Sequence, residues 1–361
     1  MYKKIILTNI FIILLTLCLS GCLDFFTDSE GVIYESQPTK VSYQIRYGYK
    51  INCSGFGRHT IKYDCDIPEV LVGTVSNILA LNENYNNINV ATFNDMISWN
   101  FTKNICSDYT LGISANVVYA ESFMITDLSG KDALNIQELQ NFHSNLVSQY
   151  CQQQSYNSEI FIDPNNEKIK NVAFQIYNST NSDNSFIVAK ELFKWLKQNT
   201  HYKINIDNVQ QACTTFDKKT GDCDDLSFLY ISFCRSLNIP ARFIRGYLVE
   251  ENSAVAHAWV EVFVGNNLGD SGWIPIECAG SSDDVENEVD TNFAFESAKH
   301  LRLFKDNGSN ESLAASLAGI SYSVAPELEF LDPEAFVEIS NYQILESKEL
   351  FVNKNNIRSY Q

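Results

Sequence analysis

The most regular hydrophobic pattern in the chain lies between Thr220 and Leu237. Apolar residues recur there every three or four positions, which is the spacing of an amphipathic helix with one buried face. Asp222 is a suitable N-cap for this helix, and Cys223 lies one turn before the apolar stripe on the same face. The pattern therefore places a thiol in the first turn of a buried helix. The stripe consists of Leu226, Leu229, Tyr230, Phe233, Cys234 and Leu237.

Two segments with the alternating polarity of β-strands follow this helix. In Ala256–Val264, His257 shares a face with aromatic residues, while the opposite face is aliphatic. In Gly272–Ala279, the same alternation directs Glu277 away from the aliphatic side. The chain thus supplies a cysteine, a histidine and a carboxylate in that order. These residue types can act as a nucleophile, its base and a group that orients the base.

The position of Cys223 has opposing effects on its thiol. Unpaired N–H groups and the helix dipole at a helix N-terminus favour the thiolate, which is the form that attacks a carbonyl carbon. The carboxylates of Asp222, Asp224 and Asp225 oppose this effect. A base is therefore needed to take the proton, and His257 is the candidate.

The remaining patterns indicate a mainly antiparallel β-rich module before the helical region. Val41–Cys53 and His59–Cys65 alternate with strand period around Gly55, which predicts a hairpin. Helical spacing is clear in Ser185–Asn199. We divide the chain into a signal or anchor segment (1–22), a tether (23–40), a β-rich module (41–134), an enzyme domain (135–322) and a C-terminal extension (323–361) whose last residues we expect to be frayed.

The ordered motifs resemble the core of the transglutaminase-like superfamily, a branch of the papain-like cysteine enzymes. The resemblance covers residues 185–279 and depends on GDCDD before the apolar helix, followed by NIPARFIRGY, HAWVEVFV and GWIPIE. It implies an α+β fold in which the helix that bears cysteine packs on an antiparallel sheet, with Cys223 as nucleophile and His257 as base. Glu277 takes the place usually held by aspartate, which is a departure from the family pattern. Residues 301–322 also resemble uncharacterised archaeal membrane proteins that carry this domain.

The N-terminus has the pattern of an export signal. Lys3 and Lys4 precede an apolar stretch, Ile5–Leu19, and the sequence Leu-Ser-Gly-Cys ends at Cys22. This ending resembles a lipobox, in which Cys22 would carry the lipid; the alternative is an uncleaved membrane anchor, although the apolar stretch is short for a span. Either interpretation predicts a domain attached to the cell membrane and facing outside the cytoplasm.

Composition and charge agree with an exported globular protein. The 361 residues are 45% hydrophobic, enough for a substantial core and about two domains. The formal net charge of −18 argues against nucleic acid as a partner, because phosphate binding needs a basic patch. Of the 10 cysteines, six outside the signal segment and the nucleophile helix are available for disulfides. Among the possible pairings we favour Cys53 with Cys65, because both flank the predicted turn.

These observations favour an exported, membrane-tethered thiol enzyme that performs acyl transfer on peptide or glutamine amides of surface proteins. Water as acceptor would give a peptidase or amidase, which we prefer, and lysine would give a crosslinking enzyme; the resemblance implies both. Tyr202, in the loop before the nucleophile helix, is a possible oxyanion donor by position. No motif for a cofactor is present. The alternatives are a non-catalytic surface binding or adhesion protein that retains the fold and, with less support, a metal site formed by Cys223, His257 and Asp222.

Overall fold

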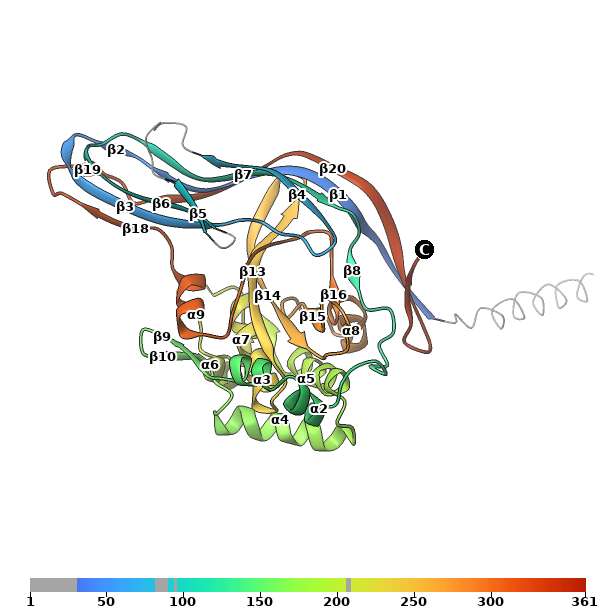
Figure 1. The fold of residues 1–361 in the computed structure, drawn as a ribbon. Helices are drawn as coiled ribbons and strands as arrows, with labels where there is room; N and C mark the ends of the chain where they lie inside the picture. Colours follow the sequence, from blue (N-terminus) through green and yellow to red (C-terminus); the bar gives the residue numbers. More distant parts are fainter. Residues whose placement is uncertain (1–30, 82–89, 94–95, 206–208) are drawn as a thin grey trace, which may run out of the picture.

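The computed structural model describes residues 31–81, 90–93, 96–205 and 209–361. The protein has two parts, a β-module and an α+β domain (Figure 1). The β-module is built by strands from residues 31–119 and 321–360, and the α+β domain contains residues 123–320. The two larger hydrophobic cores correspond to these two parts. Within these ranges no helix has the length and apolar character that crossing a bilayer requires. The predicted signal or anchor segment, with Cys22, lies outside the described residues.

The α+β domain is centred on an antiparallel four-stranded sheet with helices packed against it. The sheet has the order β15 (Trp273–Ile276), β14 (Ser253–Phe263), β13 (Ala241–Glu250) and β17 (His300–Lys305). The helices are α2 (Ile136–Phe142), α3 (Ser144–Tyr150), α4 (Glu167–Thr180), α5 (Ser185–Asn199), α6 (Ala212–Lys218), α7 (Cys223–Ser236), α8 (Val285–Asn292) and α9 (Asn310–Leu317). Helix α7 lies against β13 and β14 and contacts α4, α5 and α6 on its other sides.

Helix α7 is buried on every side rather than on the single stripe that the sequence predicted. Every residue from Asp225 to Arg235 is buried. The hydroxyl groups of Ser227 and Ser232 donate hydrogen bonds to the carbonyl groups of Cys223 and Phe228, at 2.6 and 2.7 Å. Small polar side chains that bond within the helix can therefore face the core without an unpaired group.

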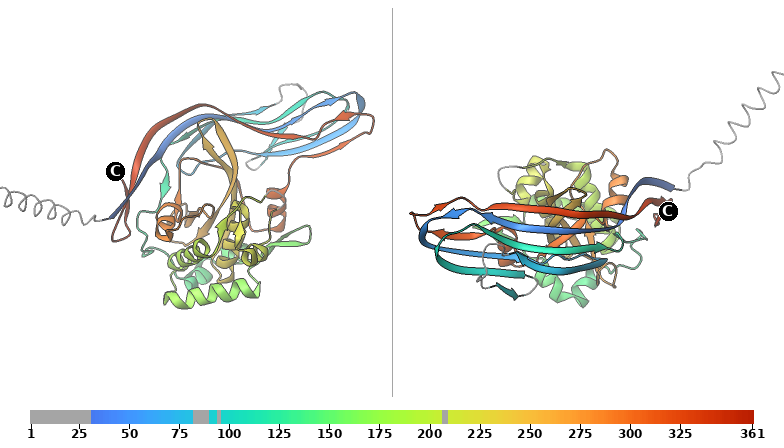
Figure 2. Two further views of the ribbon diagram at one scale, coloured as in Figure 1. Left: turned by 180° about the vertical axis from the view of Figure 1, so that it is seen from behind. Right: turned by 90° about the horizontal axis from the view of Figure 1, so that it is seen from above.

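The β-module contains a five-stranded and a four-stranded antiparallel sheet around a shared core (Figure 1). The first sheet has the order β21 (Arg358–Tyr360), β20 (Glu334–Asn353), β1 (Gly31–Ile51), β7 (Tyr109–Tyr119) and β4 (Gly73–Leu81). The second has the order β18 (Ser321–Val324), β3 (Phe56–Asp66), β6 (Met96–Ile105) and β5 (Val90–Phe93). Figure 2 shows the long strands of the first sheet curving over the α+β domain and continuing beyond it.

Short paired strands complete the fold. They are β2 (Cys53–Ser54) with β19 (Glu329–Phe330), β8 (Phe123–Met124) with β16 (Phe295–Glu296), β9 (Gln154–Tyr156) with β10 (Glu159–Ile162), and the parallel pair β11 (His201–Tyr202) with β12 (Thr220–Gly221). The β8–β16 pair lies within the α+β domain.

The predicted hairpin of Val41–Cys53 with His59–Cys65 is wrong. Strand β1 pairs with β7 and β20, whereas β3 pairs with β6 and β18. The chain passes from one sheet to the other near Gly55, so the two alternating segments face each other across the core instead of sharing a ladder. Alternation identified each strand but contained no information on its partner.

The predicted disulfide between Cys53 and Cys65 is also wrong, for the same reason. Cys53 is bonded to Cys106, 53 residues away in the sequence, because the end of β6 returns beside the start of β3. Cys65 is a free, buried cysteine at the far end of β3. Burial raises the pKa of its thiol to about 12, and it belongs to the core of the β-module.

The predicted tether and C-terminal extension are incorporated into the β-module. Residues 31–40, assigned to a tether, form the first half of β1, and residues 334–353 form the long strand β20 beside it, with Gly31 opposite Asn353. The end of the chain, which we expected to be frayed, forms β21 on the outer edge of β20. Strand pairing satisfies the backbone polar groups of both ends, so a polar composition did not prevent order.

Candidate active site

Cys223 occupies the first position of α7, as predicted. Asp222 is the N-cap, and the Asp222 N–H donates to Oδ2 of Asp225 at 3.3 Å, which closes a capping box at the helix start. Asp225 is fully buried and also accepts hydrogen bonds from Gln210. A Cβ added at Gly221 would lie 2.6 Å from Cβ of Asp225, so glycine is required where the chain enters the helix. The half-buried sulfur is therefore carried by a rigid turn.

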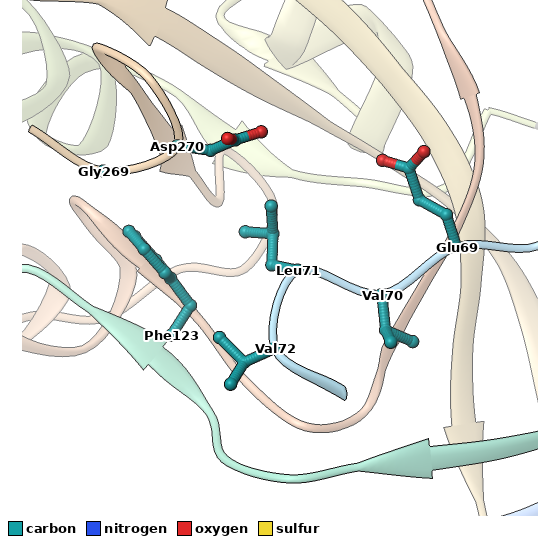
Figure 3. Close-up of a pocket in the computed structure, with 7 residues that line it drawn as sticks. All are labelled: Glu69, Val70, Leu71, Val72, Phe123, Gly269 and Asp270. Carbon is teal, nitrogen blue, oxygen red and sulfur yellow. The ribbon is translucent and has the colours of Figure 1, made fainter. Parts of the chain in front are cut away.

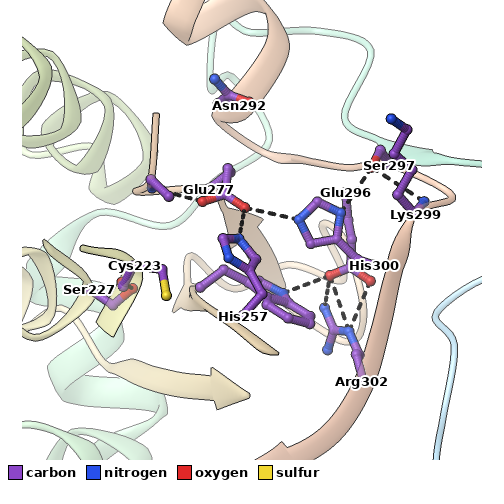
Figure 4. Close-up of polar contacts among 12 residues, drawn as sticks. Cys223, Ser227, His257, Glu277, Asn292, Glu296, Ser297, Lys299, His300 and Arg302 are labelled. Carbon is purple, nitrogen blue, oxygen red and sulfur yellow. Dashed lines mark hydrogen bonds and ion pairs between the residues drawn. The ribbon is translucent and has the colours of Figure 1, made fainter. Parts of the chain in front are cut away.

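His257 lies on β14 directly beside this helix N-terminus. Its Nε2 is 2.6 Å from Oε2 of Glu277, so Nδ1 is the ring nitrogen that remains for another partner. The backbone N–H of Ala258, the next residue, forms a hydrogen bond with the Cys223 sulfur. Figure 4 shows the imidazole between Cys223 and Glu277. No hydrogen bond joins the sulfur to the ring in the described part of the chain, as is common before substrate binds.

Glu277 follows β15 and is held at both carboxylate oxygens. Oε2 lies 2.6 Å from Nε2 of His257, and Oε1 accepts a hydrogen bond from the N–H of Ala279 at 2.7 Å. The extra methylene of glutamate, compared with the aspartate usual at this position, does not prevent contact with the imidazole. Burial alone would raise the pKa of Glu277, but the charges and hydrogen bonds of His257 and His300 outweigh it and hold this pKa well below its usual value.

His300 is a member of this cluster that the sequence analysis missed. Its Nε2 lies 2.9 Å from Oε2 of Glu277, the same oxygen that His257 contacts, and its Nδ1 lies 2.9 Å from Oγ of Ser297 (Figure 4). It is the first residue of β17, at the opposite edge of the sheet from β15 in strand order. The sequence did contain a signal of this role, because His300 is one of only 5 histidines in the chain and begins an alternating segment, HLRLFK. The sequence did not reveal that this segment joins the sheet that contains His257.

The surroundings of Cys223 disfavour a free thiolate. Burial raises the pKa of the thiol to about 12, the nearby Asp224, Asp222 and Glu277 carboxylates act in the same direction, and the N–H of Ala258 opposes them. The sequence already indicated that the neighbouring carboxylates would oppose a thiolate here. The thiol is therefore protonated at neutral pH unless a base takes the proton as the sulfur attacks.

Tyr202 lies near the sulfur at the edge of the site. Its strand, β11, pairs with β12, the two residues immediately before Asp222. Burial raises the pKa of Tyr202, and so do the nearby charges of Cys223, Asp222, Glu277 and Asp224, in that order. The side chain is 37% exposed, so its hydroxyl group is accessible from solvent. Tyr202 is therefore within the electrostatic influence of the cluster around Cys223.

Among the residues that the structure describes, two groups of side chains come close enough together to hold a metal ion. One contains His257, Glu277 and His300, and the other contains Asp222, Cys223 and Asp224, with ligand atoms within 4.8 Å of one another in each group. The set considered from the sequence, Cys223, His257 and Asp222, is not brought together in this way. In the first group both imidazoles already bond to the glutamate, so these residues need no ion to satisfy them.

A pocket elsewhere on the molecule is separate from this cluster. It has a volume of about 440 Å³ and is lined by Glu69–Val72, Phe123, Gly269 and Asp270 (Figure 3). None of Cys223, His257 and Glu277 lines it, and Glu69 is paired with Lys305 at 2.7 Å. We assign the chemistry to the cluster around Cys223, because neither a cysteine nor a histidine lines this pocket.

Comparisons with known proteins agree with this geometry. Residues 170–278 match the family described as the Transglutaminase-like superfamily. Over these residues the chain is similar to that family, and the match covers less than half of the chain. The matched range contains Cys223, His257 and Glu277. The family match and the fold together support a cysteine-enzyme class for the transglutaminase-like domain.

Individual relatives are distant. The chain is 28% identical over 134 residues to "Uncharacterized protein YebA" of Bacillus subtilis, a match that covers 31% of this chain and only 17% of that protein. The structure of "a Putative Cysteine Protease from Cytophaga hutchinsonii" has the same fold, with a TM-score of 0.53 and 16% identity over 91% of this chain and 100% of that one. The periplasmic domain of TgpA from Pseudomonas aeruginosa is more remote, with a TM-score of 0.33 and 11% identity over 67% of this chain and 92% of that one.

Proposed function

We propose that this protein is a thiol acyl-transfer enzyme that acts on peptide or glutamine amides through Cys223, His257 and Glu277. The observation that carries the proposal is the placement of the His257 ring between a helix-N-terminal sulfur and a buried carboxylate, with Nδ1 left for the sulfur. This arrangement matches the roles of nucleophile, base and orienting group.

In the first half of the reaction, His257 Nδ1 takes the thiol proton as the Cys223 sulfur attacks the amide carbonyl carbon. The oxygen becomes an oxyanion beside the first N–H of α7, which has no partner inside the helix, with the Tyr202 hydroxyl as a second donor. Collapse of this intermediate breaks the C–N bond, and the imidazolium returns the proton to the leaving amine. The acyl group remains on sulfur as a thioester.

In the second half, an acceptor attacks the thioester. His257 removes a proton from the acceptor and gives it to the departing sulfur, while Glu277 stabilises the imidazolium formed in between. Water yields a carboxylic acid, and an amine yields a new amide. We favour water, because surface peptides and peptide-linked polymers are the amides that an exported enzyme meets first.

Export and membrane attachment are part of the proposal. They are supported by the charged and apolar N-terminal sequence that ends at Cys22, and by a disulfide, Cys53–Cys106, which suits an oxidising compartment. Replacing Cys22 by serine should release the protein from the membrane fraction if the cysteine carries a lipid. Unchanged retention would instead indicate an uncleaved apolar anchor.

Labelling of the native protein by iodoacetamide, followed residue by residue with peptide mass spectrometry, tests the enzymatic proposal. We expect Cys223 to react faster near neutral pH than the same cysteine in denatured protein, and Cys223→Ser to remove that fast phase with little change in melting temperature. Cys213→Ser is the matched control, because Cys213 is also a half-buried free cysteine on a helix. A Cys223 that reacts no faster than the denatured thiol would favour a binding or adhesion protein that retains the fold.

Release of ammonia or amine from peptide and glutamine donors, compared with incorporation of a fluorescent primary amine, separates hydrolysis from crosslinking. Dominant amine incorporation at millimolar amine would replace the hydrolytic proposal by a crosslinking one.

A further inference from the structure

We propose that His300 is a positioning residue of this site, which acts by holding the Glu277 carboxylate in the orientation that His257 requires. The inference rests on the proposed function. It follows from one contact in particular: the imidazoles of His257 and His300 converge on a single oxygen, Oε2 of Glu277, at 2.6 and 2.9 Å (Figure 4).

A glutamate in this position needs such support more than an aspartate would. Its extra methylene adds a rotatable bond between the backbone and the carboxylate, and each unfixed rotation weakens the alignment of the imidazole with the sulfur. Here three donors restrain the group: His257 and His300 at Oε2, and the N–H of Ala279 at Oε1. Without His300, the remaining contacts would leave Oε2 held only by the ring that it is meant to orient.

His300 is itself held in a fixed orientation. The ring N–H at Nε2 donates to Glu277, and Nδ1 lies 2.9 Å from Oγ of Ser297. The ring packs at 76° against Trp259, with centroids 4.9 Å apart, and the Trp259 indole donates to Glu296 at 2.9 Å. Only 6% of His300 is exposed, so water does not compete for these contacts.

The backbone of His300 is anchored by the β-module. The hydroxyl of Tyr119, at the end of β7, donates to the carbonyl group of His300, and the N–H of Ala298 donates to Oγ of Ser122 at 3.0 Å. Strand β16, just before this turn, pairs with β8, which follows β7 along the chain. The second imidazole is therefore placed by contacts between two parts of the chain that the sequence analysis treated as separate.

Other charged groups surround Glu277, and the test must separate them from His300. They are Cys223, Asp222 and Asp224 on α7, Tyr202 on β11, the Lys197–Glu288 pair that joins α5 to α8, and the Glu296–Arg302 pair beside Trp259. None of these side chains forms a hydrogen bond to the Glu277 carboxylate in the described residues. His257 and His300 are the groups that keep its pKa low against the effect of burial.

Replacing His300 therefore has a predictable effect on pH dependence. Loss of its hydrogen bond and charge removes part of what lowers the pKa of Glu277, while the effect of burial, which raises this pKa, remains. The carboxyl group would then take up a proton at higher pH. Once protonated, it no longer stabilises a His257 imidazolium, so activity on the acid side should disappear at a higher pH than in the wild type.

The experiment measures the rate of Cys223 alkylation by iodoacetamide from pH 4 to 9 in the full-length chain, together with turnover of a peptide amide. The variants are His300→Phe, which cannot donate, and His300→Gln, whose side-chain amide can. His59→Gln is the control for loss of a buried histidine, because His59 is fully buried in the β-module and also has partners at both ring nitrogens, Gly57 and Tyr109. Thermal melting confirms that each variant is folded.

For His300→Phe we expect the acid limb of the alkylation profile to move to higher pH, because Glu277 loses one of the two imidazoles that lower its pKa. His300→Gln should restore most of the wild-type profile, and His59→Gln should lower the melting temperature without moving the profile. A folded His300→Phe whose profile coincides with that of the wild type would overturn the inference, even if its overall rate fell. Failure of the proposed function is distinguishable, because it appears in the wild type as a Cys223 that reacts no faster than a denatured thiol.

Discussion

Nε2 of His257 lies 2.6 Å from Oε2 of Glu277, and this contact determines which ring nitrogen of the imidazole remains for Cys223. The proton on Nε2 is fixed by the carboxylate, so Nδ1 is the nitrogen able to exchange a proton with the sulfur. In the proposed mechanism, Glu277 takes the role of the aspartate usual at this position, and its longer side chain still reaches the imidazole.

Glu277→Gln should lower turnover by about 10²-fold or more, because an amide cannot stabilise the imidazolium and can present an N–H where Nε2 needs an acceptor. The measurement is kcat/KM for a peptide amide, with folding checked by circular dichroism. Glu277→Asp is the informative companion: it keeps the charge but shortens the reach to both histidines. Wild-type rates in the glutamine variant would exclude Glu277 from the mechanism.

The sequence was most informative where a local pattern determines a local structure. The spacing around Cys223 gave the helix and its start at the nucleophile, and the alternation around His257 gave its strand and the face it presents. Helix α7 packs against β14, and β14 pairs with β15, which Glu277 follows. Local patterns were therefore enough to identify Cys223, His257 and Glu277 as candidates for one site.

The sequence was least informative about long-range pairing. The partner of β1 is β20, about 300 residues later, and the fourth member of the site, His300, is placed by a strand whose neighbour is β13. Alternation of polar and apolar residues fixes which side of a strand is buried but leaves its partner open. The errors over the hairpin, the tether and the C-terminal extension all have this cause.

The disulfide gives a direct check of the β-module topology. Replacing both Cys53 and Cys106 by serine should reduce the free energy of unfolding by about 4 kcal/mol, from the entropy of a loop of this length in the unfolded chain. The measurement is urea unfolding of the double variant against the oxidised wild type. Cys65→Ser is the control, and non-reducing peptide mapping of that variant should still find Cys53 linked to Cys106. A Cys53–Cys65 peptide in the wild type would contradict the observed strand order.

Asp224 should affect the nucleophile only in alkaline solution. Burial, followed by the hydrogen bond and charge of Asp222, raises the pKa of the Asp224 carboxyl group to about 8. Below that pH the group is mainly neutral and does not repel a thiolate; above it, the ionised carboxylate raises the pKa of the neighbouring Cys223 thiol. Asp224→Asn should therefore speed alkylation of Cys223 above about pH 8 and leave the rate at pH 6 nearly unchanged.

The control for Asp224→Asn is Asp217→Asn. Asp217 is an exposed residue of α6 that pairs with Lys168. Its replacement by asparagine removes the same formal charge from a side chain that does not contact the sulfur. Equal acceleration by both variants would show that net charge, rather than the carboxylate beside Cys223, governs the reaction.

Tyr202→Phe tests whether the phenol hydroxyl stabilises the oxyanion. If it donates to the developing negative charge, its removal should lower kcat by about 10²-fold, the usual cost of one such donor, with a much smaller change in KM. Alkylation of Cys223 by iodoacetamide forms no oxyanion, so its rate should change far less than kcat. Because the side chain is partly exposed, we also expect little change in melting temperature. Equal losses in alkylation and turnover would instead mean that Tyr202 acts on the sulfur or on His257, and unchanged kcat would leave the N-terminal amide of α7 as the principal donor.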